Sequence, residues 1–175
     1  MKLSKVVTLL LVLFGTVGCD QATKVVARKH LQGMETMSYL GDTFRLTYAE
    51  NHGAFLGLGS TLPEGVRTLI FTVFVAIFLV GLGVWLFRGE AKSYTAIVAS
   101  SLIIGGGIGN LIDRIAFDGG VTDFLNIGIG TLRTGIFNVA DVWIMAGVFL
   151  LVLAPEMWAE EGDVGDVGDE GDVGM

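Results

Sequence analysis

Side chains with possible chemistry gather in residues 105–141, within an otherwise strongly apolar sequence. The segment opens with GGGIGNLIDR, continues through VTDF and closes with FNVAD, and its last two motifs supply Asp123 and Asp141. Two carboxyl groups in one partly apolar site cannot both ionise easily, so the pair shares a proton. The ionised member can take a proton from water while the protonated member polarises a scissile carbonyl. We therefore predict that Asp123 and Asp141 form a hydrolytic dyad of the aspartic-protease type.

Amide and charged side chains accompany both aspartates. Asn110 and Asp113 lie three positions apart on one helical face, with Arg114 adjacent, and Asn138 lies three positions before Asp141. Each feature alone has a structural explanation: Asp113 and Arg114 as an interfacial ion pair, and Asp141 as a helix charge with Asn138 as its cap. Their convergence on one membrane face favours a functional site instead.

Other hydrolytic schemes find little support in the sequence. His30 and His52 are the only histidines, neither has HExxH spacing, and no GxSxG motif is present. Cys19 is the only cysteine, so the sequence contains no CxxC pair and no His/Cys ligand array. The sequence has no cluster of basic residues that would indicate a nucleic-acid-binding surface. We expect no metal and no cofactor.

The elements that must position these residues are membrane helices. The chain is 52% hydrophobic and only 17% charged, and about 20 mostly apolar residues suffice for a helix to span a bilayer. We expect four spans, at residues 6–27, 67–87, 93–112 and 137–155. The first of these segments can span the membrane only if its helix continues past Asp20 towards Ala27. The predicted fold is an all-α membrane protein with one domain, residues 1–155.

The N-terminal run has two interpretations. Lys2 and Lys5 precede an apolar stretch that ends at Cys19, a pattern that resembles a secretory signal with a lipoprotein-type cysteine. In the alternative, which we favour, the helix is uncleaved and Asp20 and Lys24 form a pair four positions apart, either functional or a solvated helix end.

The connecting segments suggest which side of the membrane each occupies. Basic residues at the N-terminus and in the tight hairpin 88–92 place both on the cytoplasmic side. Residues 28–67 and 115–136 then lie outside. Within the first of these, residues 43–48 alternate as a short strand, residues 51–57 indicate a turn, and Pro63 and Glu64 suit a helix start. Residues 156–175 form an acidic, glycine-rich repeat that we expect to be a disordered cytoplasmic tail.

Five blocks together carry a resemblance that covers residues 1 to about 155: DQATK at 20–24, NHGAF at 51–55, GGIGNLIDR at 106–114, VTDF at 121–124 and FNVAD at 137–141. The sequence resembles the lipoprotein signal peptidases (signal peptidase II), bacterial membrane aspartyl proteases. These enzymes remove the signal peptide from diacylglyceryl-modified prolipoproteins by cutting just before the lipidated cysteine. The acidic tail is not part of the family's motifs.

The resemblance implies a site and a topology. The dyad falls on Asp123 and Asp141, and the residues that hold the substrate backbone or orient the dyad are Asp20, Lys24, Asn51, Asn110, Asp113, Arg114 and Asn138. It also implies four transmembrane helices in the bacterial inner membrane, both termini in the cytoplasm, and an active site at the outer leaflet. An extracytoplasmic β-cradle and a short mobile helix would come from residues 39–62. The partners would be prolipoprotein substrates and membrane lipids, and the enzyme a monomer that binds no nucleic acid.

Two other classes of function remain open at this point. An intramembrane aspartate can relay protons or bind a cation in a small transporter, although the two halves of the chain show no internal similarity. Alternatively, the polar cluster could only hold helices together in a membrane assembly protein. In that case Asp-to-Asn changes would lower stability, with no proteolysis to lose.

Overall fold

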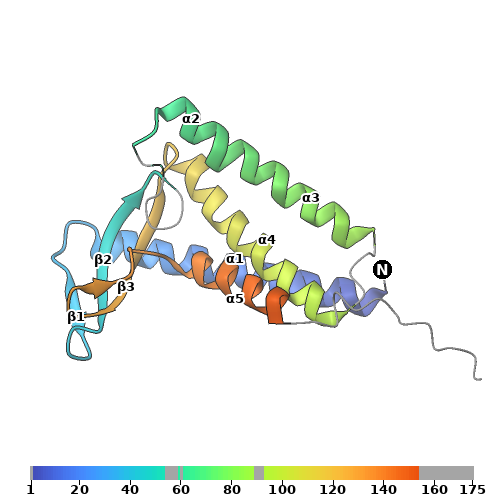
Figure 1. Cartoon of the computed structure of the whole chain (residues 1–175), viewed down its shortest axis with the longest axis horizontal. Helices are drawn as coiled ribbons and strands as arrows, with labels where there is room; N and C mark the ends of the chain where they lie inside the picture. Colours follow the sequence, from blue (N-terminus) through green and yellow to red (C-terminus); the bar gives the residue numbers. More distant parts are fainter. Residues whose placement is uncertain (1, 54–58, 60, 89–92, 154–175) are drawn as a thin grey trace, which may run out of the picture.

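The computed structural model describes residues 2–53, 59, 61–88 and 93–153 of the chain. Figure 1 shows a sheet that lies across one end of a group of long helices, with the N-terminus at the other end. We call the end of the molecule that carries the sheet the sheet end. The helices are α1 (Leu3–Leu31), α2 (Glu64–Thr68), α3 (Val75–Phe87), α4 (Tyr94–Ala116) and α5 (Val139–Leu153), and a π-helical segment, η2 (Leu69–Phe74), joins α2 to α3.

Three described helices are long and apolar enough to cross a membrane: α1, the continuous helix Glu64–Phe87, and α4. α1 passes through Asp20 without a break, because its polar residues there face other protein groups rather than lipid. α5 is apolar but has only 15 residues. The predicted spans 6–27, 67–87, 93–112 and 137–155 each overlap one of these helices, and α4 continues four residues beyond its expected end.

α4 is the most buried helix and packs against α1, α3 and α5. Glycine makes its contact with α5 close, since a Cβ at Gly106 would lie 2.5 Å from the carbonyl oxygen of Ala140. Small residues allow such approaches in membrane helices. By contrast, large apolar side chains of the second long helix are exposed, for example Phe74, Ile77 and Val80, as expected for a surface that faces lipid.

The sheet has four antiparallel strands in the order β1 (Met37–Tyr39), β2 (Phe44–Asn51), β3 (Val121–Ile129) and β4 (Leu132–Arg133). The expected strand 43–48 is confirmed within β2. The predicted source of the sheet, residues 39–62, was incomplete, because β3 and β4 follow α4. In the register of β2 and β3, Ala49 is opposite Asp123 and Asn51 is opposite Val121. The pairing therefore brings Asn51 close to Asp123.

Some predicted elements lie at the limits of the described residues or outside them. A helix does begin at Glu64 after Pro63, as predicted. The short mobile helix was expected within a stretch that includes residues 54–58 and 60, and these lie outside the described residues. So do hairpin residues 89–92 and the acidic tail.

Candidate active site

Asp123 lies on β3 with its carboxyl group almost fully buried, 2% exposed. Its Oδ1 accepts a hydrogen bond from Nδ2 of Asn138 at 2.6 Å, and its Oδ2 accepts one from Nδ2 of Asn51 at 2.9 Å. Burial raises the pKa of Asp123 to about 6, with a further contribution from the negative charge of Asp141 and against the two amide hydrogen bonds. The protonated form is therefore accessible near neutral pH.

Asp141 lies in the first turn of α5, next to Asn138, which also contacts Asp123. Its Oδ1 accepts a hydrogen bond from Nδ2 of Asn110 at 3.0 Å, and its Oδ2 accepts the backbone N–H of Asn138 at 3.2 Å. In return, Oδ1 of Asn138 accepts the backbone N–H of Asp141 at 3.1 Å. This reciprocal pair is a capping box at the start of α5.

Asn138 joins the two aspartates. Its side chain is fully buried, and its Nδ2 also donates to Oδ1 of Asn110 at 3.0 Å. The capping role that was an alternative explanation for Asn138 and Asp141 is thus present. It coexists with a direct link to Asp123, so one asparagine fixes the helix start and both carboxyl groups together.

Buried ionic contacts support the cluster from α1. The ammonium of Lys24 lies 2.9 Å from Asp20 and 3.7 Å from Asp113, and it donates to Oδ1 of Asn110 at 2.8 Å. The side chains of Lys24, Asp20 and Asp113 are all fully buried. The alternative of a solvated helix end at Asp20 and Lys24 is therefore wrong. Oδ1 of Asp20 also accepts the backbone N–H of Ala140 at 2.9 Å, which ties α1 to the first turn of α5.

Asp113 holds the start of β3. Its Oδ2 accepts the backbone N–H of Thr122 at 2.9 Å and contacts Arg28 at 3.3 Å. Arg28 also donates to Oγ1 of Thr122 at 2.7 Å. Asp113 thus pairs with Lys24 and Arg28 rather than with Arg114, contrary to the ion pair considered from the sequence. The residue before Asp123 is fixed to both α1 and α4.

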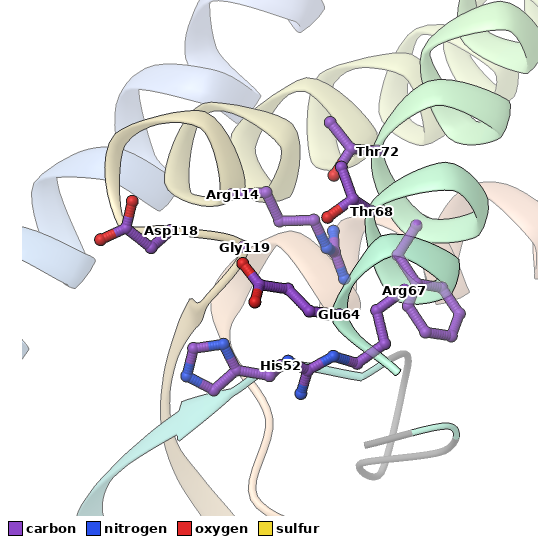
Figure 2. Close-up of a pocket in the computed structure, with 9 residues that line it drawn as sticks. His52, Glu64, Arg67, Thr68, Thr72, Arg114, Asp118 and Gly119 are labelled. Carbon is purple, nitrogen blue, oxygen red and sulfur yellow. The ribbon is translucent and has the colours of Figure 1, made fainter. Parts of the chain in front are cut away.

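Asn51 and Arg114 meet at the end of β2. Besides its bond to Asp123, Asn51 accepts the backbone N–H of Gly53 at 2.9 Å, and Arg114 donates to the carbonyl oxygen of Gly53 at 2.9 Å. Figure 2 shows Arg114 pointing from α4 into a small pocket that Glu64 and His52 also line. Nε of Arg114 is buried and has no hydrogen-bond partner among the described residues.

Three residues of the cluster were missed in the sequence. Nε2 of Gln21 donates to Asp20, to the carbonyl oxygen of Gly109 and to Asp113, at 3.0–3.2 Å. Arg28 and Thr122 make the contacts described above. Gln21 and Arg28 lie three positions before and four after Lys24, so helical spacing could have indicated them. Thr122 lies in the VTDF motif directly before Asp123, but the motif gave no role to its side chain.

Comparisons with known proteins identify the family of this chain. The family model described as "Signal peptidase (SPase) II" matches residues 12–155. The lipoprotein signal peptidase of Syntrophotalea carbinolica is 36% identical over 155 residues, 88% of this chain and 94% of that protein. The lipoprotein signal peptidase of Borrelia turicatae is 34% identical over 139 residues, 77% of this chain and 81% of that protein.

A solved structure described as a bacterial membrane enzyme, obtained by the in meso method at 2.3 Å resolution, superposes with a TM-score of 0.73 at 27% identity. The match covers 90% of this chain and 94% of that one. The family match extends from residue 12, within α1, through the other helices and the sheet, and its range includes all nine residues expected at the site. The chain belongs to the signal peptidase II family of aspartic peptidases.

Proposed function

We propose that this protein is a membrane aspartic endopeptidase that removes the signal peptide from diacylglyceryl-modified prolipoproteins, cutting just before the lipidated cysteine. The observation that carries the proposal is the arrangement of Asp123 and Asp141 around Asn138. Both carboxyl groups bond to Asn138, Asp123 to its side-chain amide and Asp141 to its backbone N–H. Burial raises the pKa of Asp123 to about 6, and a carboxyl group that keeps its proton near neutral pH can serve as the acid of a carboxyl dyad.

In the proposed mechanism Asp123 is the acid and Asp141 the base. Asp141 takes a proton from water while the water oxygen attacks the carbonyl carbon before the cysteine. Protonated Asp123 donates a hydrogen bond to the carbonyl oxygen as negative charge develops there. The C–N bond then breaks, and Asp141 passes its proton to the departing amine of the cysteine.

The remaining residues divide into two groups in this proposal. Asp20, Lys24, Asn110, Asp113 and Asn138 orient the dyad through the contacts described above. Asn51 and Arg114 hold the extended substrate backbone beside it, because binding energy must be directed to orienting the scissile bond. Asn51 also orients Asp123 directly.

The proposed topology has four spans in the bacterial inner membrane, with both termini in the cytoplasm. α5 is the fourth span; its 15 described residues measure about 22 Å at 1.5 Å per residue, and the predicted span 137–155 extends two residues beyond them. The sheet end faces the outer leaflet and supplies the β-cradle that covers the site. We propose that the enzyme acts as a monomer on prolipoproteins presented from the surrounding lipid.

A gel-shift cleavage assay tests the proposal. Purified full-length protein in detergent is incubated with a diacylglyceryl-modified prolipoprotein, with and without a chelator. We expect cleavage by the wild type in both lanes, and none by Asp123→Asn or Asp141→Asn. Glu35→Gln is the matched control, because Glu35 is an exposed carboxylate that makes none of the contacts described above.

The outcomes separate the classes of function. Cleavage retained by either dyad variant would refute the dyad. Lack of cleavage by folded wild type would refute the peptidase function for this substrate. The polar cluster would then be tested as part of a transporter or of a membrane assembly protein. Loss of cleavage in variants with wild-type thermal stability would argue against a purely structural cluster.

A further inference from the structure

An apolar groove of about 450 Å³ lies between α1 and the sheet. Its lining includes Val26, Ala27 and Leu31 from the last turns of α1, and Met37, Leu46 and Phe124 from β1, β2 and β3. The volume lies within the usual range for small-molecule sites. The groove therefore has the size and the surface of a site for an apolar chain.

The groove lies behind the proposed dyad, on the other face of β3. Successive side chains of a strand point to opposite faces, and here Asp123 bonds to Asn51 and Asn138 whereas Phe124 packs with Ala27 and Leu31. A substrate bound at Asp123 would therefore not fill the groove. Its occupant must come from the surroundings of α1.

Charge at the rim indicates what that occupant is. The last turn of α1 carries Arg28, Lys29 and His30. Arg28 is engaged with Asp113, but Lys29 and His30 are exposed, and His30 lines the groove. Lys29 carries a positive charge and the imidazole N–H of His30 can donate a hydrogen bond, so both complement the phosphate of a lipid whose chain lies on the adjacent apolar surface.

The far end of the sheet adds a second apolar surface. Leu40, Ile129 and Leu132 are 81%, 80% and 83% exposed, and they lie in or next to the turns that end β1 and β3. These turns are adjacent, since the backbone N–H of Gly128 donates to the carbonyl oxygen of Thr43 at 2.9 Å. Contact with lipid would remove this surface from water, so the sheet that lines the groove has a second region suited to contact with acyl chains.

We propose that the groove binds one acyl chain of a bilayer phospholipid with an anionic head group, whose phosphate lies at Lys29 and His30. The chain fills the space behind Phe124 and so supports the strand that carries Asp123. The lipid is a resident of the membrane and not the diacylglyceryl group of a substrate. This site does not depend on the proposed function.

Photolabelling tests the site in the full-length protein. The wild type is placed in phosphatidylcholine nanodiscs that contain a small fraction of phosphatidylglycerol with a diazirine on one acyl chain, and labelled residues are mapped by mass spectrometry. We expect labelling to concentrate on groove residues. Val26→Trp should reduce this labelling at least fivefold by filling the groove. Val25→Trp is the matched control, because Val25 and Val26 are 55% and 58% exposed and only Val26 lines the groove.

Two further experiments test whether the site prefers an anionic head group and whether the bound acyl chain comes from a phospholipid or from a prolipoprotein. A phosphatidylcholine probe should label the groove less than the phosphatidylglycerol probe, and the double change Lys29→Gln and His30→Gln should remove the difference. A prolipoprotein with a diazirine in its acyl chain should not label the groove. Equal loss in both tryptophan variants, no preference for the anionic probe, or labelling by the prolipoprotein chain would each overturn the proposal. Thermal stability of each variant shows that it is folded.

Discussion

Asn138 and Asp141 bond to each other in both directions: the Asn138 side chain accepts the Asp141 N–H at 3.1 Å, and the Asp141 carboxylate accepts the Asn138 N–H at 3.2 Å. The amide nitrogen of the same asparagine donates to Asp123 at 2.6 Å. One residue, Asn138, thus contacts the N-terminus of α5 and both carboxyl groups, Asp123 through its side chain and Asp141 through its backbone.

Substitutions at Asn138 should separate these two roles. Serine is also a good N-cap, so Asn138→Ser should keep most of the helix stability but lose the donor to Asp123. We expect cleavage to fall at least tenfold while the melting temperature stays close to that of the wild type. Asn138→Ala should lower both, with about 1 kcal/mol of stability lost from the cap. Full activity in Asn138→Ser would show that the bond to Asp123 is dispensable.

The pH dependence of cleavage should report the acid. Because burial raises the pKa of Asp123 to about 6, this carboxyl group is protonated below that pH and loses its proton above it. If Asp123 is the acid, kcat/KM should fall tenfold per pH unit on the alkaline side of about pH 6. Steady-state kinetics from pH 4.5 to 8.5 measures this limb. A profile that stays flat through pH 6 to 8 would contradict the assignment.

Stability should depend on the same proton. The folded pKa of Asp123 lies above the ordinary value of 3.8, so its contribution is fully present below about pH 4 and is lost as the pH rises through about 6. We expect the melting temperature of the wild type in detergent to decrease over this window. Asp123→Asn should remove that decrease, since asparagine does not titrate. An identical slope in both proteins would count against a raised pKa.

Lys24 should be essential for folding as well as for orientation. Removing one partner of a buried ionic cluster leaves uncompensated charge, so Lys24→Met should cost about 3–5 kcal/mol. Lys29→Met is the control, because Lys29 is exposed on the same helix, and surface changes usually stay within about 0.5 kcal/mol. Adding Asp20→Asn to Lys24→Met should recover part of the loss in thermal or denaturant unfolding. Equal stabilities of the Lys24 and Lys29 variants would refute the buried network.

Local spacing predicted much of this structure. Hydropathy indicated the long helices, the spacing of Asp20 and Lys24 predicted their pair, and the three-residue interval before Asp141 indicated Asn138 as a cap. Contacts between distant segments were not predictable in this way. Lys24 bonds to Asn110, 86 positions away, through the packing of α1 on α4, which no local pattern encodes.

The second half of the sheet shows the same limit. Residues 115–136 were interpreted only as a connecting segment outside the membrane. Residues 121–129 within this segment form β3 by pairing with β2, and Asp113 accepts the backbone N–H of Thr122 at the start of that strand. Sequence motifs were enough to name the proposed functional residue on β3. The strand itself could not be predicted, because it forms only by pairing with β2, which is distant in the sequence.

Gly106 tests whether the spacing of α4 and α5 matters for the dyad. A Cβ at this position would lie 2.5 Å from the carbonyl oxygen of Ala140, a backbone atom in the turn that carries Asp141. Gly106→Ala should therefore push the start of α5 away from α4 and lengthen the bond between Asn110 and Asp141. We expect at least a tenfold loss of kcat and a lower melting temperature.

Gly81→Ala supplies the control for this change. No heavy atom lies within 4 Å of a Cβ built at Gly81, and alanine favours a helix interior by roughly 1 kcal/mol over glycine. This variant should keep full activity with equal or higher stability. If Gly106→Ala behaves in the same way, the two helices can separate without disturbing the dyad. The close contact would then serve packing alone, and the position of Asp141 would depend on Asn138 and Asn110 rather than on the spacing of the helices.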